Sequence, residues 1–127
     1  MTAIAAYVRR ALLPLVSVGT FAWLLHRLTG VALVVYLVPH FLSIHAARGG
    51  ASVFDAELAA FRTPLFAVAE WVLIGAVAFH GFNGLRLIAL DLFDLSGRQR
   101  AMFVTVLLAT LAVLAAASWL FVPRILE

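Results

Sequence analysis

The chain has 127 residues, of which 65% are hydrophobic and 12% are charged, and its net charge is +3. A soluble domain usually contains about 45–50% apolar residues, so we expect the bilayer to be the solvent, and the scattered arginines that carry the charge do not indicate nucleic-acid binding. Cysteine is absent, which excludes disulfides, thiolate-bound zinc and iron–sulfur clusters held by this chain.

Apolar runs predict an all-α membrane protein with three spans, at about 20–45, 64–92 and 100–122. A helix needs roughly 20 apolar residues to cross the bilayer core, and each run is long enough. The length permits a single domain over 1–127. Its first part, 1–19, resembles a signal peptide but has no clear cleavage site, so we interpret it as an interfacial segment.

Turn and cap residues separate the spans. A glycine-rich stretch at 48–52 ends the first span, a short helix is expected within 51–61, and a turn is expected at 94–98. Thr63 and Pro64 indicate a helix start, as N-cap and first helical residue. Arginine bias places the N-terminus in the cytoplasm: Arg9, Arg10, Arg27, Arg86, Arg98 and Arg100 lie on that side, and Arg48, Arg62 and Arg124 on the other.

His80 is the ionisable residue that lies deepest in a predicted span. It is too far from either end to reach the head groups, and Asn83, Gly84 and Asp91 follow it along one helix face. Gly84 would leave room for a flat macrocycle, and a neutral imidazole suits axial ligation of haem iron. Alternatively, His80 bonds a neighbouring helix and Gly84 allows close packing.

Other polar residues lie nearer the ends of the spans. His26 and Arg27, with Gly30 one turn on, suit haem propionates or a quinone carbonyl, or else reach lipid phosphates. His40 lies on nearly the same face as His26, as a second haem ligand or an interfacial histidine. Glu70 is expected within reach of the interface or of Arg62, and a proton-path role for it has no support.

Two runs resemble the signatures of succinate dehydrogenase cytochrome b subunits. Trp23–Gly30 (WLLHRLTG) is similar to the S-x-x-H-R-x-[ST]-G motif of the first span. Phe79–Arg86 (FHGFNGLR), with Asp91 beyond it, is similar to the H-x-x-N-G-[IL]-R-[HV]-x-x-x-D motif of the second. The resemblance covers residues 20 to 122.

The resemblance implies a role for each matching residue. His80 would be one axial ligand of haem b, with the second supplied by a partner anchor subunit. His26 and Arg27 would lie near the propionates, with Arg27 also bordering the quinone site. Asp91 would lie near the iron–sulfur subunit, and Gly30 and Gly84 are expected to pack against haem.

The sequence also departs from the family pattern. Trp23 replaces a serine that contacts quinone in mitochondrial-type members, so we expect it to form a wall of the quinone site instead. Leu87 replaces the motif's second histidine. Together with His40, these departures look more like the actinobacterial-type branch, and the quinone would be menaquinone or ubiquinone.

By resemblance, the chain would be the haem b membrane anchor of succinate dehydrogenase (complex II), in a bacterial or archaeal cytoplasmic membrane. It would form half of a heterodimeric helix bundle and carry one or two haems. Its other partners would be membrane lipid and the iron–sulfur and flavoprotein subunits, which hold the chemistry of succinate oxidation. The alternatives are a fumarate reductase anchor, a haem-free quinone-site anchor and a small transporter, and three non-repeating spans speak against the last.

Overall fold

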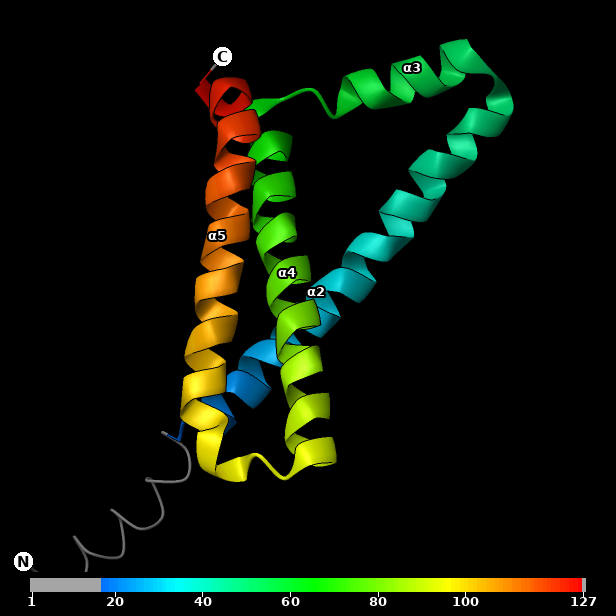
Figure 1. The fold of residues 1–127 in the computed structure, drawn as a ribbon. Helices are drawn as coiled ribbons and strands as arrows, with labels where there is room; N and C mark the ends of the chain where they lie inside the picture. Colours follow the sequence, from blue (N-terminus) through cyan, green and yellow to red (C-terminus); the bar gives the residue numbers. More distant parts are fainter. Residues whose placement is uncertain (1–16, 127) are drawn as a thin grey trace, which may run out of the picture.

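The computed structural model of the chain describes residues 17–126, which fold into helices (Figure 1). In chain order these are α2 (Val18–Ala46), η1 (Ala47–Gly49), α3 (Ala51–Ala60), α4 (Pro64–Phe93), η2 (Ser96–Arg98) and α5 (Gln99–Leu126). Three of them, α2, α4 and α5, are long and apolar enough to cross a membrane. The predicted all-α class with three spans is therefore confirmed, while most of the predicted interfacial segment, 1–19, lies outside the described residues.

Side chains cap the start of two long helices. The Ser17 hydroxyl accepts a hydrogen bond from the backbone N–H of Thr20 at 3.1 Å, which satisfies a donor at the first turn of α2. Thr63 does the same for the N–H of Phe66 at 3.4 Å, and Pro64 occupies the first helical position of α4. The predicted cap at Thr63 is thus confirmed.

Two residues with positive φ turn the chain between helices. Gly50 has φ +94°, which a residue with a Cβ rarely adopts, and it separates η1 from α3. Asp94 has φ +48° and ends α4 in the left-handed conformation, with its N–H donating to the carbonyl of Leu90. The predicted turns and the predicted short helix are confirmed.

The helices form an open arrangement (Figure 1). Antiparallel α4 and α5 lie side by side along their length, whereas α2 begins near the α4–α5 turn, crosses α4 near its middle and diverges from it towards the other end. There α3 bridges back to the start of α4. A hydrogen bond from Ser43 Oγ to Glu57 Oε1, 3.0 Å long, ties α2 to α3.

The core of the described chain is small and lies where α2 reaches the α4–α5 pair. It consists of Ala22, Phe79, Phe103 and Val106, with the two phenyl rings edge to face at 6.4 Å. Most other large apolar side chains are exposed, as lipid-facing residues are when the bilayer replaces water. The three long helices therefore meet at this cluster, close to the crossing point of α2 and α4.

Candidate functional site

Two histidines that lie far apart in the sequence meet where α2 crosses α4. The rings of His26 and His80 stack with their centroids 3.9 Å apart and their planes 10° from parallel. His80 occupies the middle of α4, so the pair lies at a depth where an ionisable side chain is costly. The sequence singled out both residues, and the structure shows that they form one site.

Each histidine faces a glycine of the opposite helix. A Cβ built on Gly30 would lie 3.1 Å from His80 Cε1, and one built on Gly84 would lie 3.7 Å from His26 Cε1. The missing side chains thus make room for the two imidazoles. Packing of these glycines against haem stays a prediction, because the contacts seen in the chain are to the histidines.

Hydrogen bonds fix the tautomer of His80. Its Nδ1 lies 3.2 Å from the carbonyl of His26, which can only accept, and 3.2 Å from Thr29 Oγ1. The Thr29 hydroxyl hydrogen is already directed at the carbonyls of Leu25 and His26, each 2.9 Å away. Nδ1 must therefore carry the proton, and in the neutral ring the lone pair is on Nε2.

This tautomer gives the site one nitrogen that can bind a metal. His80 Nε2 has no hydrogen-bond partner within residues 17–126 and is not buried, so it reaches the surface of the chain. A ligating histidine commonly donates its other N–H to a carbonyl, as His80 does. Since the two rings are stacked, each lone pair lies in a separate plane, and the pair cannot hold one iron from opposite sides.

The described residues contain no group of three or more metal-ligating side chains. His80 Nε2 is therefore a single ligand position, which alone could bind a metal carried by a cofactor.

His26 and Arg27 do not act as a pair in the structure. His26 turns towards α4, and its Nδ1 is buried without a hydrogen-bond partner among the described residues. Arg27 is exposed, and its guanidinium carbon lies 4.1 Å above the ring of Trp23. The predicted site residues thus form two neighbouring groups, one facing α4 and one facing away.

Sequence reasoning missed a buried polar cluster beside the histidines. Asn83 is fully buried and Arg86 is 4% exposed, although Arg86 was expected near the cytoplasmic end of its span. Arg86 donates to Asn83 Oδ1 and to the carbonyl of Gln99, both at 3.3 Å, because the start of α5 covers it. The i, i+3 spacing of two polar residues inside a span was the signal that could have revealed this cluster.

Two further candidates lie away from the crossing point. His40 stacks on Tyr36, with its Nδ1 3.0 Å from the tyrosine hydroxyl, and both are exposed. Asp91 is exposed near the end of α4 and forms no ion pair with any described residue. Neither joins the His26–His80 pair, so their functional roles stay predictions.

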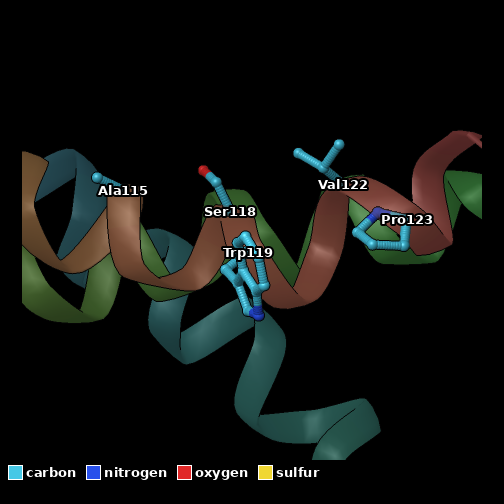
Figure 2. A pocket seen from close by; sticks show the side chains of 5 residues that line it. All are labelled: Ala115, Ser118, Trp119, Val122 and Pro123. Atoms are coloured by element: carbon cyan, nitrogen blue, oxygen red, sulfur yellow. The ribbon is translucent and has the colours of Figure 1, made fainter.

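The end of the α4–α5 pair that lies away from the α4–α5 turn carries an ion pair, a hydrogen bond between the two helices and a groove. Glu70 was expected within reach of the interface or of Arg62, and its carboxylate pairs with Arg124 at 3.0 Å. Trp71 Nε1 donates to Ser118 Oγ at 3.1 Å. A groove of about 590 Å³ runs along α5 (Figure 2), lined by Ala115, Ser118, Trp119, Val122 and Pro123. It contains no titratable group and lies far from the histidines.

Comparisons with known proteins agree with this architecture. Residues 8–117 match the family model described as succinate dehydrogenase/fumarate reductase transmembrane subunit. Succinate dehydrogenase 2 membrane subunit SdhC of Mycobacterium tuberculosis is 29% identical over 89 residues, which are 70% of this chain. The match spans 65% of that relative's length, so the chain spans slightly less than two thirds of it.

Two archaeal relatives are also similar. The succinate dehydrogenase hydrophobic membrane anchor subunit of Halobacterium salinarum is 30% identical over 78% of each chain. The subunit of the same description from Archaeoglobus fulgidus is 34% identical over 55% of this chain and 60% of its own. The chain is therefore a multi-pass membrane protein that belongs to the family of succinate dehydrogenase/fumarate reductase transmembrane subunits.

Proposed function

We propose that the chain holds one haem b through His80 and forms part of a quinone site, as a membrane anchor of succinate:quinone oxidoreductase. The proposal rests on which ring nitrogen of His80 carries the proton. Its Nδ1–H is bound by acceptors on α2, at 3.2 Å each, which leaves a lone pair on Nε2 in the middle of a membrane span.

The surroundings of His80 support its role as an axial ligand. Thr29 and the His26 carbonyl fix the ring orientation, and outer partners of this kind raise the basicity of a ligating imidazole. Haem b, when bound, supplies one-electron chemistry beside the quinone. A second haem ligand would come from a partner anchor subunit, because the His26 ring is stacked on the ring of His80.

The quinone site would use Arg27 and Trp23, which lie on the side of α2 that faces away from α4. Reduction of a quinone to a quinol takes two electrons and two protons, and negative charge develops on the quinone oxygens as the electrons arrive. Arg27 would stabilise that charge, with Trp23 as a wall. His26, adjacent in sequence, would relay protons. The electrons would come from succinate through the flavoprotein and iron–sulfur subunits.

The topology and partners follow from the same proposal. The N-terminus would lie in the cytoplasm of a bacterial or archaeal cell, with the chain in the cytoplasmic membrane. Asp91, exposed near the α4–α5 turn, would then face the iron–sulfur subunit. A fumarate reductase would use the same parts in the other direction, and comparing the rates of succinate oxidation and fumarate reduction separates the two.

The test is a reduced-minus-oxidised optical spectrum of the purified complex, with haem quantified per chain. His80→Ala should remove haem b, whereas replacement of His45, an exposed histidine at the end of α2, by alanine should retain it. If the wild type holds two haems and one survives in His80→Ala, His40 becomes a ligand candidate. A wild-type complex without haem refutes the cytochrome proposal and leaves a haem-free quinone-site anchor.

A further inference from the structure

Arg86 is a buried cation whose hydrogen-bond partners are neutral. Its side chain is 4% exposed, and it donates to the side-chain carbonyl of Asn83 and to the backbone carbonyl of Gln99, each at 3.3 Å. The ring of Phe103 lies 5.7 Å from the guanidinium carbon. A guanidinium stays protonated in proteins, so this site holds a full positive charge. Burying such a charge inside a membrane span is costly unless an opposite charge pairs with it.

No acidic side chain pairs with Arg86 in the described part of the chain. The ion pair that forms within residues 17–126 lies at the other end of α4 and α5. Asp91 and Asp94, the acidic residues closest to Arg86 in sequence, are exposed and take no part in it. Residues 1–16 contain neither aspartate nor glutamate. Within these residues the charge of Arg86 is therefore not neutralised.

This charge lies close to His80 along the same helix. Six positions on α4 separate the two residues, an axial rise of about 9 Å, and Asn83 lies one turn from each. Because the guanidinium binds the Asn83 side chain, it is held beside the turn that follows His80. At an effective dielectric constant of about 20, a unit charge about 12 Å away changes the equilibrium of a one-electron transfer about tenfold.

We propose that Arg86 raises the redox potential of the haem held by His80, acting through its charge and not by contact. The inference rests on the proposed haem ligation. Reduction adds one electron to the iron and breaks no bond, so a nearby positive charge stabilises the reduced form and raises the midpoint potential. Since Arg86 is buried, salt screens this effect much less than it screens the effect of an exposed arginine.

The experiment is a potentiometric titration of the haem optical spectrum in the purified complex, which measures the midpoint potential without turnover. Arg86→Gln removes the charge, so at a fixed solution potential the ratio of reduced to oxidised haem should fall about tenfold, which is about 59 mV for one electron. Arg86→Lys retains the charge but not the planar fork of donors, and it should retain most of the wild-type midpoint.

The matched control is Arg100→Gln, which removes the same charge from an exposed arginine next to Gln99. Water and salt screen that charge, so the midpoint should shift much less, and the shift should shrink in high salt while that of Arg86→Gln persists. Asn83→Asp gives a second test if Arg86→Gln does not assemble. It places a carboxylate where Arg86 already binds an amide oxygen, and it should lower the midpoint with the arginine still present.

The outcomes separate this inference from the proposed function. A complex that binds haem in Arg86→Gln and Asn83→Asp with the wild-type midpoint overturns the role of the charge and leaves ligation by His80 intact. Equal downward shifts in Arg86→Gln and Arg86→Lys also overturn it, because the lost hydrogen bonds would then be the cause. A wild-type complex without haem refutes the proposed function, and the inference fails with it.

Discussion

Adding one methyl group at Gly30 should disturb the His26–His80 pair, whereas the same change at Gly84 should not. The new Cβ at position 30 would lie 3.1 Å from His80 Cε1, inside the roughly 3.5–4.0 Å of an ordinary carbon–carbon contact. The imidazole of His80 cannot easily yield, because His26 stacks on it at 3.9 Å and α2 binds its Nδ1. At Gly84 the corresponding distance is 3.7 Å, which is ordinary contact.

Both substitutions replace glycine by alanine inside a helix and change helix propensity equally. The difference between the stabilities of the two variants therefore reports the packing around each new methyl group. Glycine to alanine inside a helix gains about 1 kcal/mol in each case, and overpacking a tight site costs about 1–3 kcal/mol. Gly30→Ala should therefore be less stable than Gly84→Ala by about 1–3 kcal/mol. Heat-induced loss of helical circular dichroism, measured on the complex in mild detergent, should show a lower midpoint for Gly30→Ala. Equal midpoints, or a higher one for Gly30→Ala, would refute the close approach of α2 and α4.

Replacing Arg86 should cost more stability than replacing Arg124, because Arg86 is buried and Arg124 is exposed. Arg86→Met leaves Asn83 Oδ1 and the Gln99 carbonyl without their donor, and in a buried site this should cost about 1–3 kcal/mol, measured as the same thermal midpoint. Arg124→Gln breaks the pair with Glu70, whose side chains are 45% and 39% exposed, and should cost at most about 1 kcal/mol. That smaller loss should shrink further in high salt, and a larger loss for Arg124→Gln than for Arg86→Met contradicts the burial argument.

The sequence was sufficient to predict the helices because each one is encoded locally. Long apolar runs give the spans, and Thr63 with Pro64 gives a helix start that depends only on adjacent residues. The last span is predicted at about 100–122, and the helix that contains it, α5, continues through Pro123 to Leu126. A proline cannot donate to the carbonyl four residues earlier, yet it leaves the backbone of the final turn free to remain helical.

Contacts between helices could not be read from the sequence in the same way. His26 and His80 are separated by 54 positions, and their stacking depends on where α2 crosses α4. A histidine followed by a glycine at i+4 in both spans is consistent with this contact but does not determine it. Likewise, Glu70 finds Arg124 through the antiparallel register of α4 and α5, which hydropathy does not encode.

Burial of single polar residues was the least predictable feature. An arginine seven positions before the end of a span can extend to the head groups or turn inwards, and the sequence is the same in both cases. Arg86 turns inwards because Gln99, at the first turn of α5, offers its carbonyl, and Phe103 lies 5.7 Å from the guanidinium. Both partners lie on α5, so the direction of the Arg86 side chain depends on the packing of α5 against α4 and is not set by α4 alone.

The geometry of the histidine pair also explains why one chain supplies only half of the proposed haem site. Stacking against His26 and the bonds from Nδ1 leave Nε2 as the free direction of the His80 imidazole. This fixes the orientation of a ligand before any cofactor binds, which lowers the entropy lost on binding. It also commits His26 to the ring face of His80, so His26 is not available as the opposite ligand. In the proposed site, a helix from a partner subunit would approach the exposed side of the crossing point, and haem would join two subunits as well as carry electrons.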